Sequence, residues 1–79
     1  MKNTSILFTP MRNVYFQNKN GEVDIIKPNT RILIIKYKSV PSEFVNVLFV
    51  TCVFEKKLLE FSIPIRTDET FKDYFFDLS

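Results

Sequence analysis

Residues that could carry out acid–base or nucleophilic chemistry are scarce in this sequence of 79 amino acids. It contains no histidine and a single cysteine, Cys52. Serine and cysteine nucleophiles usually rely on a neighbouring histidine as base, so those dyads cannot form within this chain. Glu22 and Asp24 could in principle act as an acid–base pair, but they follow a predicted turn, where solvated surface carboxylates are the simpler interpretation. We therefore expect a non-enzymatic protein with no catalytic residues.

Ligands for metals and cofactors are equally few. Zinc sites that combine histidine with several cysteines cannot be assembled, and no D-x-[DN]-x-[DN]-G calcium loop occurs. A loop that cradles phosphate needs several glycines, whereas Gly21 is the only glycine. Cys52 lies in the apolar run 49–54, where a free cysteine behaves as a small core hydrophobe. The sequence predicts no metal site, no cofactor and no internal disulfide.

Basic residues in the N-terminal half could bind nucleic acid. Residues 1–40 hold seven Lys or Arg against two acids, and residues 41–79 hold four against seven. Small barrels bind single strands with cations that track phosphates and aromatic rings that stack on bases. The alternative is that strand-end lysines protect sheet edges from aggregation while the aromatic ring packs in the core. The candidate nucleic-acid-binding residues are Lys36, Tyr37, Lys38, Arg31, Arg12 and Lys27.

The C-terminal segment offers a candidate protein interface. With Thr67 as a possible N-cap, apolar residues recur at helical spacing and should pack on the sheet: Phe71, Tyr74, Phe75 and Leu78. Phe76 lies off that stripe in a helix, among charged residues. A large exposed aromatic ringed by polar groups is typical of an interface anchor. The predicted protein-interface residues are Phe76, Asp73 and Asp77.

The elements that position these residues are expected to be mostly strands. Alanine is absent, while Val, Ile, Phe and Tyr, which favour extended structure, are abundant. Asn20-Gly21 between strands 12–17 and 22–27 predicts a hairpin, because glycine tolerates the positive φ of its turn. Three more strands are predicted at 31–38, 43–55 and 58–65, and Pro64 makes the last one an edge or its end. The prediction is one domain, 1–79, of mainly β (α+β) class: a small antiparallel meander or partly open barrel of about five strands with one short C-terminal helix.

Two of the predicted strands, 31–38 and 43–55, are apolar on both faces. One short helix can cover only one face of so small a sheet. An uncovered apolar face would exceed the few hundred Å² that monomers usually expose. We therefore expect a homodimer or higher oligomer, or an obligate partner protein.

The leading hypothesis is a non-enzymatic protein-interaction module that self-associates. Nine Phe, eight Ile and eight Lys residues, all with AT-rich codons, favour a phage or mobile-element origin and hence a protein that binds and inhibits a host factor. The alternative is a small β-barrel that binds single-stranded nucleic acid or a nucleotide. Because the apolar stretches are too short for a signal peptide or a membrane span, we expect a cytoplasmic location, in the host cell if phage-encoded, and no membrane partner.

Overall fold

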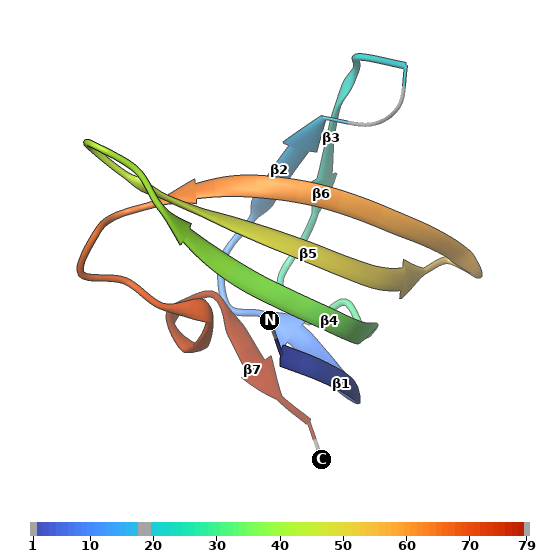
Figure 1. The fold of residues 1–79 in the computed structure, drawn as a ribbon. Coiled ribbons are helices and arrows are strands. Elements are labelled where there is room, and N and C mark those ends of the chain that lie inside the picture. The colour runs from blue at the N-terminus through green and yellow to red at the C-terminus, as the bar shows by residue number, and fades with distance from the viewer. Residues whose placement is uncertain (1, 18–19, 79) are drawn as a thin grey trace.

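The computed structural model describes the backbone of residues 2–17 and 20–78, and the side chains of residues 6–17 and 20–78. Five strands of this part form an antiparallel sheet in the order β6-β5-β4-β1-β7, and two form a separate hairpin (Figure 1). The predicted mainly β, antiparallel fold class is confirmed. In chain order the elements are β1 (Lys2–Pro10), β2 (Val14–Gln17), β3 (Val23–Ile26), β4 (Ile32–Pro41), β5 (Asn46–Phe54), β6 (Lys57–Ile65), the 3-10 turn η1 (Phe71–Asp73) and β7 (Phe75–Asp77).

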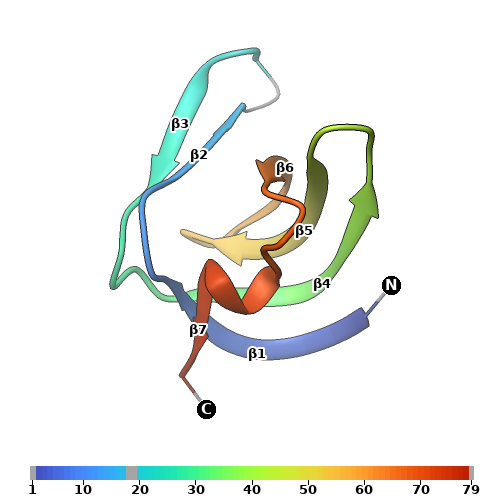
Figure 2. The same cartoon turned by 90° about the vertical axis from the view of Figure 1, so that its left-hand side faces the viewer.

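The five-stranded sheet is strongly curved, and the turn η1 lies within its concave side (Figure 2). We call this side the inner face and the opposite side the outer face. Alternation along the strands sends the buried side chains of β5 and β6 inward. Those side chains, each at most 6% exposed, are Leu48, Val50, Cys52, Phe61, Ile63 and Ile65.

The β2–β3 hairpin closes the core beside β6. Val14, Phe16 and Ile26 are its buried residues, and the rings of Phe16 and Phe61 lie 5.0 Å apart between centroids. Gly21 has a φ of +83°, the left-handed conformation for which the predicted turn requires glycine. The hairpin prediction is confirmed, although residues 18–19 of its turn lie outside the described residues.

Two elements differ from the sequence expectation, and the two are linked. Strand β1 was not predicted, because its first residues are polar and carry little β propensity. The C-terminal helix is a single 3-10 turn, after which the chain becomes β7 and pairs with β1. An isolated helix of so few residues is marginal, whereas β7 supplies partners for the second edge of β1. Phe71 and Phe75 are nevertheless buried and Tyr74 is partly buried, as the helical stripe predicted, but Leu78 of the same stripe is exposed, because β7 turns it to the outer face.

The connection between β5 and β6 is a tight two-residue loop. Glu55 and Lys56 have φ of +53° and +64°, and the flanking residues Phe54 and Lys57 pair directly. Two positive φ values in succession match the right-handed twist of the strands. The turn thus lies one residue before the connection, 56–57, that the predicted strands 43–55 and 58–65 leave between them, and it fixes the register of β6 against β5.

Candidate interaction surfaces

A row of apolar side chains crosses the outer face of the sheet. Leu58 of β6 pairs with Val53 of β5, Val53 with Leu33 of β4, and Leu33 with Leu7 of β1. The N–H of Leu78 then donates to the carbonyl oxygen of Leu7 at 2.9 Å. Directly opposed residues lie on one face of a sheet, so these five residues form a continuous row.

Most of this row is open to solvent. Leu58, Leu7 and Leu78 are 59%, 44% and 41% exposed, and Leu33 and Val53 are partly exposed. The sequence indicates that strands 31–38 and 43–55 are apolar on both faces, but no local pattern in it marks these five residues as one row. The alternation in 58–65 could have placed Leu58 outward, but only the observed register aligns it with Leu7, far away in the sequence.

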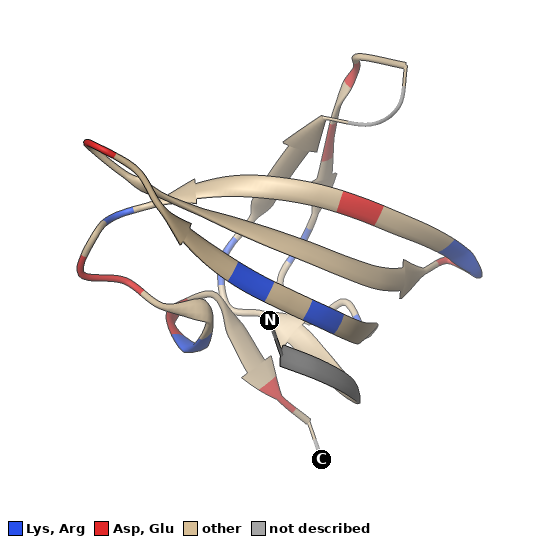
Figure 3. Ribbon diagram, viewed as in Figure 1, with Lys and Arg blue, Asp and Glu red and all other residues tan. Residues whose placement is uncertain are grey.

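A second outer row carries charge. Lys36 of β4 pairs with Thr51 of β5, and Thr51 pairs with Glu60 of β6. Figure 3 shows the two basic positions of β4 and the acidic position in the middle of β6, with β5 between them. Glu60 is exposed and Lys36 is partly exposed. The row is thus positive on one side of β5 and negative on the other.

A β-bulge in β4 decides where the predicted nucleic-acid residues point. Ile34 pairs with Cys52, but the next partner, Thr51, pairs with Lys36, which leaves Ile35 as the extra residue. Lys36 and Lys38 therefore point outward. Tyr37 points inward, where its ring stacks on that of Phe71 at 3.7 Å and 8°. The cations and the ring that were expected to share one surface lie on opposite faces of the sheet.

Arg12 contacts three residues of the C-terminal segment. Its Nη1 lies 3.5 Å from Glu69 Oε2, its guanidinium lies 4.2 Å above the ring of Tyr74, and its Nη2 donates to the carbonyl oxygen of Asp73 at 3.3 Å. Arg31 and Lys27 are exposed, but neither belongs to β4, the strand that carries Lys36 and Lys38. The six candidate residues do not form one continuous basic surface.

The three predicted interface residues are also separated. Phe76 is 57% exposed and pairs with Thr9, which places it on the outer face near Leu78. Asp77 follows it in β7 and therefore points the other way. Asp73 Oδ2 accepts a hydrogen bond from the backbone N–H of Thr70 at 2.8 Å and so closes the 3-10 turn. Of the three, only Phe76 belongs to the apolar outer face, and its role in binding stays a prediction.

Glu69 holds the segment before η1 against the core. Its Oε1 accepts hydrogen bonds from the Arg66 N–H at 2.8 Å and the Tyr74 hydroxyl at 2.9 Å. The backbone hydrogen bond from Arg66, with the Tyr74 hydroxyl and nearby Arg12, lowers the pKa of Glu69 below its usual value. Desolvation, together with donation to Glu69, raises the pKa of Tyr74. The contact thus favours ionised Glu69 and neutral Tyr74.

Cys52 lies in the centre of the inner face and is completely buried. Burial raises the pKa of its thiol to about 11, so the nucleophilic thiolate is strongly disfavoured. This placement confirms Cys52 as a core residue.

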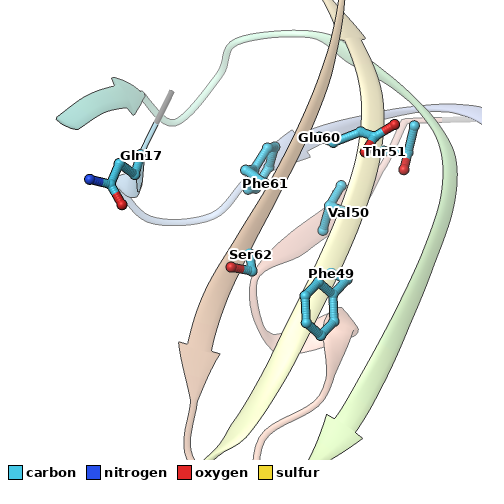
Figure 4. Close-up of a pocket in the computed structure, with 7 residues that line it drawn as sticks. All are labelled: Gln17, Phe49, Val50, Thr51, Glu60, Phe61 and Ser62. Atoms are coloured by element: carbon cyan, nitrogen blue, oxygen red, sulfur yellow. The ribbon is translucent and has the colours of Figure 1, made fainter. Parts of the chain in front are cut away.

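The hollows that the described residues line are open to solvent, and none of them gathers catalytic groups. One of about 410 Å³ lies over β5 and β6, where Glu60 and Thr51 stand side by side (Figure 4). Within residues 2–17 and 20–78 there is no cluster of three or more Cys, Asp or Glu side chains that could hold a metal ion. In the same part of the chain no helix is long and apolar enough to cross a membrane.

Comparison with known proteins does not assign the chain to a family: no family model, curated protein or solved structure matches it. The functional conclusion therefore rests on the surfaces described above.

Proposed function

We propose that this protein is a non-enzymatic protein-interaction module that self-associates through the outer face of its sheet. The observation that carries the proposal is the apolar outer row, in particular Leu58, Val53 and Leu33 on three adjacent strands. The inner face of the same strands is covered by η1 and the hairpin, whereas none of the described residues covers this part of the outer face. Burying these side chains would gain roughly 25 cal/mol per Å² of apolar surface.

A second copy of the chain is the occupant that fits this surface. The charged row beside the apolar row carries both signs, Lys36 on one side and Glu60 on the other. A surface that carries both signs can be complementary to itself, whereas a surface of one sign needs a partner of the other. The further hypothesis of a phage protein that inhibits a host factor stays a prediction.

Sedimentation velocity across a concentration series tests the proposal. We expect the 9.4 kDa chain to sediment increasingly as a dimer as its concentration rises into the high micromolar range. Leu58→Glu, which adds charge at an exposed position on the outer face, should abolish the concentration dependence. Val23→Glu is the matched control, since Val23 is 73% exposed but belongs to the separate hairpin.

Two results would overturn the proposal. The first is a wild-type chain that remains monomeric throughout the series. The second is a Leu58→Glu variant that associates as strongly as the wild type. A wild-type monomer that also binds single-stranded DNA in a salt-sensitive way would favour the alternative nucleic-acid hypothesis.

A further inference from the structure

The outer face of β4, β5 and β6 is arranged almost symmetrically about β5. At one level Lys36 and Glu60 flank Thr51, and toward the β5–β6 turn Leu33 and Leu58 flank Val53. Toward the other end of the strands, Lys38 and Ser62 flank Phe49, and Val40 and Pro64 flank Val47. Across β5, apolar positions match apolar ones at the levels of Val53 and Val47, and opposite signs match at the level of Thr51, while at the level of Phe49 the cation Lys38 stands across from the hydroxyl of Ser62.

From this pattern we infer that two copies pack outer face to outer face around a two-fold axis that runs along β5. The inference rests on the proposed self-association and assigns its geometry. Rotation about this axis places β4 of each copy over β6 of the other. Lys36 of each copy therefore faces Glu60 of the other, which gives two such contacts per dimer. Packed sheets lie about 10 Å apart, a gap that an extended Lys and Glu together bridge.

Other placements of the axis bring like charges together. An axis along β4 places Lys36 opposite Lys36 of the second copy. An axis across the strands at the level of Thr51 does the same. Like charges held opposite one another in an interface are strongly unfavourable. Only the β5 axis satisfies Lys36 and Glu60 together, while it also puts Leu33 against Leu58 of the second copy.

The size of the surface predicts a weak dimer. The matched rows span three strands, about 15 Å across, and about 20 Å along the strands. That surface is well below the ~800 Å² per partner of a standard stable interface, and the convex outer face concentrates contact near β5 (Figure 2). Association is therefore expected at micromolar concentrations or above.

Charge-reversal variants test the axis. Lys36→Glu would place a second carboxylate opposite Glu60 at both contacts of a homodimer, and Glu60→Lys would place a second ammonium group opposite Lys36. Each variant alone should raise the dimer dissociation constant about tenfold or more. An equimolar mixture should form a heterodimer of near wild-type affinity, because both of its contacts then pair a glutamate of one variant with a lysine of the other. The double variant Lys36→Glu/Glu60→Lys, with unchanged net charge, should also recover dimerisation.

Lys27→Glu, a charge reversal on the exposed end of the hairpin, is the control and should leave association unchanged. Phe76→Ala should also leave dimerisation unchanged, because β7 is three strands from the axis; the predicted interface role of Phe76 then concerns another partner protein. The axis is wrong if the mixture and the double variant both fail to recover dimers, if neither single variant weakens them, or if Phe76→Ala abolishes them. If one of these outcomes is observed and Leu58→Glu still disrupts association, the outer face remains the interface and only the axis is wrong. A wild-type chain that stays monomeric overturns both proposals.

Discussion

Strand β5 carries apolar side chains on both faces of the sheet, but the two faces have different surroundings. On β5, Leu48, Val50 and Cys52 point inward and are at most 2% exposed, while Phe49 points outward and is 43% exposed. The inner face is covered by elements of the same chain, whereas no described element covers the outer face of β5. Apolar residues on both faces of a strand therefore predict that both will be buried, but not that one chain will bury both.

Two aromatic residues near the C-terminus, one on each face, provide the strongest test of this difference between the inner and outer faces. Phe71 packs against the rings of Phe8, Tyr37 and Phe75 on the inner face, whereas Phe76 is exposed on the outer face. Phe71→Ala should lower the free energy of unfolding by roughly 3–5 kcal/mol, much of the stability of a domain this small. Phe76→Ala should change it by no more than about 0.5 kcal/mol.

Urea denaturation of both variants checks these values. Equal losses of stability for the two variants would show that the division between covered and uncovered faces is wrong at the C-terminus.

The attachment of the segment that covers the inner face should depend on pH. The folded state lowers the pKa of Glu69, so its stabilising contribution is present above the ordinary value of 4.5 and is lost as the pH falls through the lowered value. The raised pKa of Tyr74 gives stability that is present below its ordinary value of 10.0 and lost as the pH rises through the raised value.

Thermal melting between pH 3 and 11 measures both limbs. Glu69→Gln should flatten the acid limb, and Tyr74→Phe should flatten the alkaline one. An acid limb that is the same in Glu69→Gln and wild type would assign the acid sensitivity to other carboxylates.

A smaller effect than that of Phe71→Ala, and of opposite sign, is expected at a residue that pairs with Phe76. Thr9 is 9% exposed, and its Oγ1 is buried without a hydrogen-bond partner among the described residues. An unsatisfied buried hydroxyl is unfavourable, and removing it with an apolar group of the same shape can be neutral or stabilising. Thr9→Val should therefore raise the unfolding free energy by up to about 1 kcal/mol. A clear loss in urea denaturation would mean that the hydroxyl is satisfied in solution.

The central part of the fold could be predicted because local signals agree there. The Asn20-Gly21 turn, the two-faced run of β5 and the alternation in β6 each favour one structure, and each was found where expected. The C-terminal segment gave conflicting signals: its apolar spacing suits a helix, but its aromatic residues suit a strand equally well. Pairing with β1 settled the conflict, and no pattern within residues 67–78 reveals that partner.

By itself, the sequence determined the mainly β class, the hairpin, the edge position of β6 and the burial of Cys52, because these follow from residue type, turn chemistry and alternation. Tertiary structure alone decided which residues share a surface. The bulge at Ile35 turns Lys36 outward and Tyr37 inward, and strand register brings Leu58 level with Leu7. Register depends on hydrogen bonds between distant segments. The candidate interface could therefore be identified only from the pairing of the strands, not from the sequence.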